Sequence, residues 1–185
     1  GSEMCIRDRT KGSAGQSYGA FCNNGMVLRH KGTCNDGVGK SACGGEIIIN
    51  NPSDTKTKIL RNVLVGNFAL FGATGGRLFV EGEAGDRFAV RNSGATAVVE
   101  GVGEYCAEYM TNGTILNLGT FSRGFGNGMS GGFAYQYDPK KVIKKNISKE
   151  SVLFNYLDGK TEISNIHEET IFTLLNWHFN ATKSR

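Results

Sequence analysis

Proline and long hydrophobic runs are the features that this sequence most clearly lacks. Only 2 of its 185 residues are proline, whereas 27 are glycine, about twice the usual glycine share of ~7%. A glycine excess without proline excludes collagen and a proline-rich linker. No stretch approaches the ~18 consecutive apolar residues that a membrane-spanning helix needs, so we expect no membrane partner.

Cysteine and histidine are too few and too scattered to form a metal centre or a disulfide framework. The five cysteines are an odd set without a CxxC pair, and the three histidines are His30, His167 and His178. None of these histidines has a carboxylate or cysteine partner at a readable spacing. We therefore predict no catalytic, cofactor-binding or metal-ligating residue in this chain. Reduced, mostly buried thiols without a recognisable export signal favour the cytoplasm.

The folded body also lacks a basic stripe. The net charge is +4, and residues 139–185 carry 8 Lys/Arg against 5 Asp/Glu. The lysines gather in the pairs Lys140-Lys141 and Lys144-Lys145, beside an expected linker. A nucleic-acid site would place basic residues with interleaved aromatics on the folded body. We interpret the lysines as a solvated hinge and expect no nucleic-acid partner.

What the sequence has in abundance is glycine, and its placement is periodic. Of the 27 glycines, 25 lie between Gly12 and Gly132, and six times a glycine precedes a short β-rich run. The spacing between successive glycines of this kind is 18 to 20 residues, with one spacing of 31 that contains a polar insertion at residues 50–58. The insertion has the composition of a surface loop. Six rounds exceed the three that a repeat array usually needs.

Short runs at this period predict a coil. Runs of three to four residues, at about 3.3 Å per residue, form the short sides of a coil whose neighbours pair above and below. The predicted fold is all-β: a right-handed parallel β-helix with ~19-residue coils and a short C-terminal helical tail. The right hand follows the general rule for parallel crossovers. The predicted structural corners are Gly75, Gly76, Gly94, Gly113, Gly124, Gly126, Gly128, Gly131 and Gly132.

Three regions are expected along the chain. Residues 1–11 are a leader outside the domain, 12–138 form the β-helix, and 139–185 form a linker and a helix. Asn165 with Glu168 three residues later resembles a capping box and predicts the helix start. Its apolar face is expected to contain Ile171, Leu174, Leu175 and His178.

Two glycine-rich stretches superficially resemble nucleotide-binding loops. The stretch Gly37-Val-Gly39-Lys40-Ser41 has Cys34 where a phosphate loop needs its first glycine. Gly124-Phe-Gly126-Asn-Gly128 lies inside the repeat and leads to another β-rich run. We interpret both as coil corners. Asp86, Arg87 and Arg91 are interpreted as a structural ion-pair ladder along the coils.

Several stretches resemble a known family. Residues 12–21, 44–49, 66–105, 108–114 and 125–135 closely resemble the carboxy-terminal domain of the glutamate synthase large subunit. That domain is named for a GxGxG motif, which Gly124, Gly126 and Gly128 match here. The chain departs from the family pattern at Glu104-Tyr105-Cys106-Ala107-Glu108. A more distant resemblance is to the third subunit of formylmethanofuran dehydrogenase.

The resemblance implies a non-catalytic domain that braces the amidotransferase and FMN-binding synthase domains. The family's enzyme converts glutamine and 2-oxoglutarate to two glutamates, using FMN, an iron–sulfur cluster and reduced ferredoxin or a nicotinamide nucleotide. The sites for this chemistry lie in other domains, so none of their residues transfers to this chain. The chain alone is predicted to be inactive. Its predicted location is the cytoplasm, or the plastid if the chain comes from a plant or alga.

Alternatives remain open at this point. The chain is either a fragment of the large subunit or a separately encoded subunit. A second hypothesis is a free-standing β-helical subunit of another oxidoreductase, such as formylmethanofuran dehydrogenase. An independent enzyme with a site on one coil face comes third.

Overall fold

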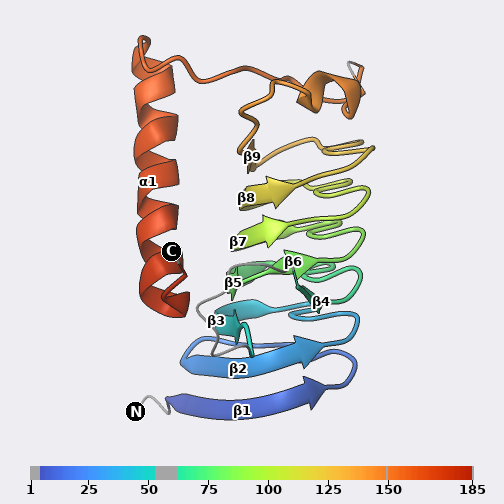
Figure 1. Cartoon of the computed structure of the whole chain (residues 1–185), viewed down its shortest axis with the longest axis vertical. Helices are drawn as coiled ribbons and strands as arrows, with labels where there is room; N and C mark the ends of the chain where they lie inside the picture. Colours follow the sequence, from blue (N-terminus) through green and yellow to red (C-terminus); the bar gives the residue numbers. More distant parts are fainter. Residues whose placement is uncertain (1–4, 53–61, 149, 185) are drawn as a thin grey trace.

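The computed structural model describes residues 5–52, 62–148 and 150–184, so most of the expected polar insertion lies outside the described residues. These residues form a parallel β-solenoid of about six turns, and one α-helix lies beside it in this described part (Figure 1). The all-β parallel fold with a C-terminal helical tail is confirmed. No helix among the described residues is long and apolar enough to cross a membrane.

Parallel strands from successive coils stack into one sheet. The main column contains β1 (Ile6–Ala14), β2 (Met26–Cys34), β3 (Cys43–Asn50), β5 (Gly75–Val80), β7 (Ser93–Gly101), β8 (Asn112–Thr120) and β9 (Phe133–Gln136). The short strands β4 (Val63–Val65) and β6 (Glu83–Ala84) form a second column of parallel strands on another side of the coils. This column begins at the end of β2, which pairs with β4. Arg77 pairs with Thr96, which is the expected step of 19 residues.

The apolar runs form strands that are buried on both faces, which explains why they do not alternate with polar residues. Successive side chains of a strand point to opposite faces. One column therefore points into the solenoid and contains Ile47, Leu78, Ala97 and Ile115. The neighbouring column points outward and contains Ile48, Phe79, Val98 and Leu116. The helix covers this outer column.

Helix α1 (Glu162–Thr182) packs along the outer column through Leu174 and Ala181. It begins before the predicted start, because Thr161 is the N-cap and its hydroxyl accepts from the Ser164 amide at 3.1 Å. Asn165 is therefore inside the helix, and the capping-box prediction was wrong. Of the predicted apolar face, Leu174 is buried, whereas Leu175 is 38% exposed.

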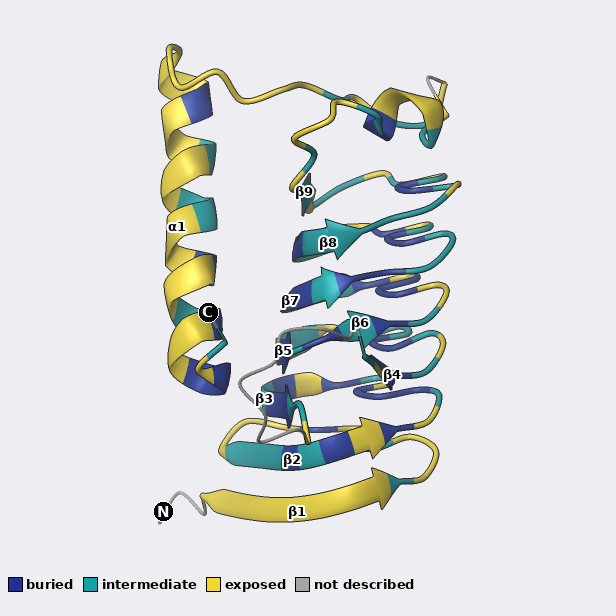
Figure 2. Ribbon diagram, viewed as in Figure 1, coloured by how far each residue is buried: buried dark blue, intermediate teal, exposed yellow. Residues whose placement is uncertain are grey.

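The two ends of the solenoid differ. Strand β1 is exposed along almost its whole length, and it begins at Ile6, ahead of the predicted domain start at Gly12 (Figure 2). At the other end, the 3₁₀ helix η1 (Ile143–Lys145) and the chain after it cover the last coil. Ile143, Ile147 and Phe154 pack there against the interior cluster.

Candidate functional site

The feature that recurs in every coil is a five-residue turn on the side away from α1 and the main strand column. Its first, third and fifth residues all have positive φ, between 44° and 75°. The six turns contain, in order, Ser17/Gly19/Phe21, Gly37/Gly39/Ser41, Phe68/Leu70/Gly72, Arg87/Ala89/Arg91, Tyr105/Ala107/Tyr109 and Gly124/Gly126/Gly128. The last turn carries three glycines, and the other five adopt the same alternation with other residues at some or all positions. Sequence reasoning interpreted the second turn, Gly37/Gly39/Ser41, as a corner and missed the other four.

Backbone hydrogen bonds join the turns into a ladder. The amide of the first left-handed residue donates to a carbonyl of the following turn, as Arg87 does to Glu104 at 2.7 Å. The amide of the fifth residue does the same, as Arg91 does to Glu108 at 2.9 Å. The amide of the third residue donates to the preceding turn, as Ala89 does to Ala69 at 2.8 Å. These bonds hold the unusual alternation in place.

The third residue of each turn points into the core. Leu70, Ala89 and Ala107 are 1%, 0% and 0% exposed. The first and fifth residues lie outward, where large side chains and glycines meet across neighbouring coils. A Cβ on Gly128 would lie 2.5 Å from Cδ1 of Tyr109, and a Cβ on Gly124 would collide with the ring of Tyr105. The glycines of the last turn therefore make room for two tyrosine rings.

The remaining glycines predicted as corners lie at the beginnings of strands. Gly75 and Gly76 open β5, Gly94 and Gly113 are the second residues of β7 and β8, and Gly131 and Gly132 precede β9. Gly76, at φ +90°, shows why glycine occurs here: a Cβ would lie 2.6 Å from the carbonyl oxygen of Gly44 in the coil below. The close approach of backbones in adjacent coils leaves no space for a side chain.

Each histidine makes a specific contact. His178 on α1 is 3% exposed, and its Nε2 lies 2.8 Å from Oε1 of Glu100 at the end of β7. The prediction that no histidine has a carboxylate partner was wrong, because 78 residues separate this pair. Nδ1 of His178 has no hydrogen-bond partner among the described residues. The pair joins α1 to the solenoid.

The other two histidines also join neighbouring structural elements. Nδ1 of His30 lies 2.7 Å from the hydroxyl of Thr10 in the adjacent coil. Nδ1 of His167 lies 2.6 Å from the hydroxyl of Tyr135, which joins the start of α1 to β9.

Charged side chains on the turn side support the ladder. Oδ1 of Asp86 accepts from the Glu104 amide at 2.8 Å, and Oδ1 of Asp36 accepts from the Asn67 amide at 2.7 Å. Arg123 pairs with Glu104 at 3.1 Å. Arg87 lies 3.8 Å from Glu108. The predicted ion-pair ladder of Asp86, Arg87 and Arg91 was therefore wrong in its partners, because Asp86 binds a backbone amide and Arg87 pairs with Glu108.

The buried cysteines are not poised for chemistry. Cys22, Cys34 and Cys106 are buried in different coils, and Cys5 and Cys43 are exposed. Burial raises the pKa of Cys34 to about 12 and raises the pKa of Cys106 further above its ordinary range. Such thiols stay protonated and do not act as nucleophiles. Among the described residues, no three His, Cys, Asp or Glu side chains converge as metal ligands would.

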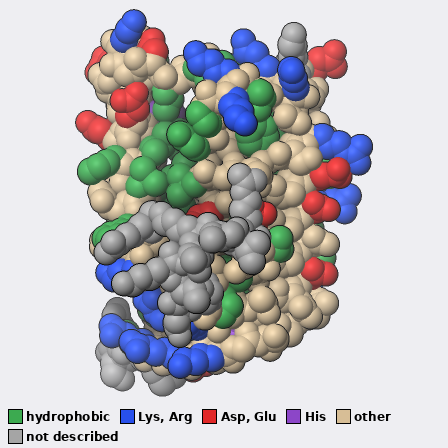
Figure 3. Space-filling model, viewed as in Figure 1, with side chains coloured by type: hydrophobic (Ala, Val, Ile, Leu, Met, Phe, Trp, Pro, Cys, Tyr) green, Lys and Arg blue, Asp and Glu red, His purple; other side chains and the backbone are tan. Residues whose placement is uncertain are grey.

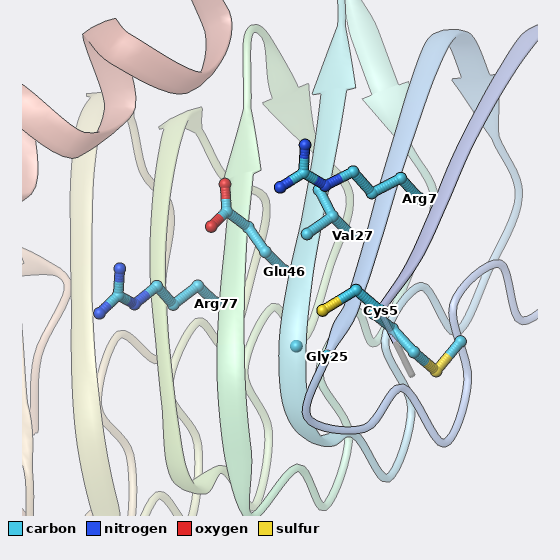
Figure 4. A pocket seen from close by; sticks show the side chains of 8 residues that line it. Cys5, Arg7, Gly25, Val27, Glu46 and Arg77 are labelled. Carbon is cyan, nitrogen blue, oxygen red and sulfur yellow. The ribbon is translucent and has the colours of Figure 1, made fainter. Parts of the chain in front are cut away.

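Two open pockets of about 260 and 430 Å³ lie near the amino-terminal coils. Figure 4 shows that Arg7, Glu46 and Arg77 lie on one face of the smaller pocket. Cys5 also lines it, but no histidine does. The larger pocket contains Arg29, whose guanidinium donates at 2.5 Å to the carbonyl of Ala181 near the end of α1. That arginine serves to hold the helix.

Large apolar side chains are exposed on two surfaces. On α1, Phe172 and Phe179 are 66% and 46% exposed, and at the far end of the solenoid Leu153 is fully exposed. Figure 3 shows hydrophobic side chains gathered along α1 and beside the upper coils. Exposed apolar patches commonly mark protein–protein interfaces.

Comparison with known proteins identifies the family of the chain. A family model described as "GXGXG motif" matches residues 2–185. The chain is 50% identical over 160 residues to the ferredoxin-dependent glutamate synthase of Antithamnion sp., covering 85% of this chain and 10% of that protein. It is 46% identical over 165 residues to the glutamate synthase [NADPH] large chain of Bacillus subtilis, covering 89% and 11%. It is 44% identical over 161 residues to the chloroplastic ferredoxin-dependent glutamate synthase of Spinacia oleracea, covering 85% and 10%. The chain thus spans about a tenth of the length of these relatives.

Proposed function

Because the chain belongs to the GXGXG motif family, we propose that it acts as the structural, non-catalytic domain of a glutamate synthase large chain. In that enzyme, glutamine and 2-oxoglutarate yield two glutamates. The proposed role is to brace the amidotransferase and FMN synthase domains. Whether these domains lie on the same polypeptide or on separate subunits does not alter the role.

The observation that carries the proposal is the contrast between the inside and the outside of the solenoid. The interior is filled with apolar side chains such as Phe88 and Ile115, both 0% exposed. The exterior presents apolar residues on α1 and at the end of the stack. A rigid body with apolar patches on its surface is suited to hold other domains in place.

The cofactors of the proposed enzyme belong to its other domains. An iron–sulfur cluster needs several thiolates converging on one point. Cys22, Cys34 and Cys106 are buried in different coils, so these cysteines do not fit a cluster. The chain's own residues therefore supply packing and docking surfaces, and we derive no chemical step through FMN or a cluster. We place the protein in the cytoplasm or, in a plastid-bearing source, in the plastid, as for the chloroplastic relative.

A replacement experiment tests the proposal. The segment of the Bacillus subtilis large chain that matches this protein is exchanged for the present sequence, and assembly and glutamate synthase activity are measured. We expect the chimera to assemble and to retain activity, and a variant lacking the segment to lose both. The 185-residue chain alone is assayed in parallel for glutaminase and glutamate synthase activity. Activity of the isolated chain would overturn the proposal, as would a chimera that does not assemble.

A further inference from the structure

Among the described residues, the ladder of turns ends with two amides that lack the partner found in every earlier turn. In each of the first five turns, the amides of the first and fifth left-handed residues donate to carbonyls of the next turn, at 2.7 to 3.2 Å. The last examples are Tyr105 to Arg123 and Tyr109 to Asn127, both at 2.9 Å. The corresponding amides of the sixth turn belong to Gly124 and Gly128. Within the described part of the chain, neither has an acceptor.

The sixth turn has the same backbone as the others, so its amides are held in the same arrangement. Gly124 and Gly128 have φ of 72° and 68°. The middle amide, of Gly126, donates backward to Cys106 at 2.7 Å, as the third residue does in every earlier turn that has a predecessor. The described residues that follow contact the middle of the turn: Asn146 accepts from the Phe125 amide at 3.2 Å, and Val152 lies over Gly126.

Two apolar residues at this end of the solenoid are exposed. The Tyr109 ring lies against Gly128 and is 51% exposed, and Leu153, next to Val152, is fully exposed. Unpaired backbone donors beside apolar side chains are the elements with which proteins bind extended segments. The donors bind main-chain carbonyls, and the apolar contacts select side chains. We call Gly124, Gly128, Tyr109 and Leu153 the terminal turn surface.

We propose that the terminal turn surface binds an extended segment from another domain of the glutamate synthase large chain, an inference that rests on the proposed function. Two backbone carbonyls of the segment accept from Gly124 and Gly128, and an apolar side chain of the segment contacts Tyr109 and Leu153. The choice of acceptor follows from continuity, because carbonyls accept at every earlier rung of the same ladder. The choice of source follows from length, because the chain spans about a tenth of its relatives.

Hydrogen–deuterium exchange tests this contact in the Bacillus subtilis chimera and in the 185-residue chain alone. In the isolated chain, we expect two fast-exchanging amides in the peptide covering residues 123–130, because unpaired exposed amides are not protected. In the chimera, their exchange should slow at least tenfold. An assembled chimera without added protection at 123–130 would overturn the inference and leave the proposed function standing. A chimera that does not assemble would overturn both.

Two matched variants separate this surface from the other exposed apolar face. Leu153→Asp places a charge on the terminal turn surface, and Phe172→Asp places the same charge on α1. Both side chains are exposed, so both isolated variants should unfold at the wild-type temperature. In the chimera, we expect Leu153→Asp to remove the added protection at 123–130 and Phe172→Asp to retain it. The reverse result would overturn the inference.

A second copy of the chain is the competing occupant. The carbonyls of Gln16 and Ala20 in the first turn are the equivalents of those that accept in later turns, so two copies could stack head to tail. Sedimentation of the isolated chain over a hundredfold concentration range distinguishes the two occupants. A constant monomer mass supports the inference. Dimers whose formation protects residues 123–130 would overturn it.

Discussion

The turn Gly124/Gly126/Gly128 and the turn Arg87/Ala89/Arg91 have the same alternation of left-handed residues, yet only the first contains glycine. A left-handed conformation costs a residue with a Cβ roughly 1–2 kcal/mol. The hydrogen-bond ladder and the buried third residue offset this cost in the earlier turn. Conformation alone therefore does not require the glycines of the GxGxG motif. Gly124 and Gly128 are required by the rings of Tyr105 and Tyr109, which occupy the space of the missing side chains.

The largest expected loss of stability comes from placing a side chain at Gly124, where the Tyr105 ring occupies the space. Gly124→Val combines a β-branched side chain at φ 72° with a collision against the Tyr105 ring, and should lower the free energy of unfolding by about 4 kcal/mol. Arg87→Val is the matched control, at the equivalent position two turns earlier. It should cost about 1.5 kcal/mol, because arginine already tolerates the conformation there. Urea denaturation measures both, and equal losses would show that conformation alone selects glycine.

A double-mutant cycle isolates how much of the cost of substituting Gly124 comes from the Tyr105 ring. Gly124→Ala should cost about 3 kcal/mol in the wild-type chain but only about 1 kcal/mol in a Tyr105→Ala background. The difference of about 2 kcal/mol is the coupling between the two sites. Gly126→Ala with Tyr105→Ala serves as a control pair, because the neighbour of Gly126 is Val152. A coupling of zero between Gly124 and Tyr105 would contradict the packing explanation.

These turns mark the limit of what the sequence predicts. The periodic apolar runs, such as Ile47-Ile48-Ile49, specify the parallel strands because backbone pairing and burial act on every coil alike. The turns are invisible where Leu70, Ala89 or Ala107 takes the third position, since nothing in such residues indicates a positive φ. The contact between His178 and Glu100 is equally hidden, because it depends on where α1 docks. The sequence indicates a corner where glycine takes at least two of the left-handed positions in alternation, as in Gly37/Gly39/Ser41 and Gly124/Gly126/Gly128.

The second residue of the fourth, fifth and sixth turns is Phe88, Cys106 and Phe125. Of these three, only Cys106 has a side chain that ionises at alkaline pH, so alkaline pH should affect its turn alone. Burial raises the pKa of Cys106 well above its ordinary value of 9.0, so the thiol ionises in the unfolded chain first. Its stabilising contribution is complete below pH 9 and is lost as the pH rises above it. At pH 10 the loss should be about 1.4 kcal/mol. Denaturation of wild type and Cys106→Ala at pH 7 and pH 10 measures this difference.

The buried thiols Cys22 and Cys34 have pKa values raised in the same direction, so they contribute to the total alkaline loss in both proteins. Subtracting the pH dependence of Cys106→Ala from that of wild type isolates the one thiol within the turn. An identical pH dependence in the two proteins would show that Cys106 ionises as readily in the folded turn as in the unfolded chain.

The smallest expected effect is a gain in the free energy of unfolding, whereas the earlier predictions are losses. Ser41 is the fifth residue of its turn, at φ 55°, and Ser41→Gly relieves the left-handed strain while making the unfolded chain more flexible. The net result should be a stabilisation of about 0.5 kcal/mol. Ser13→Gly, in the extended strand β1, is the matched control and should destabilise by a similar amount. If both substitutions destabilise equally, the ladder has removed the strain at Ser41, and this non-glycine position is as relaxed as the glycine that ends the last turn.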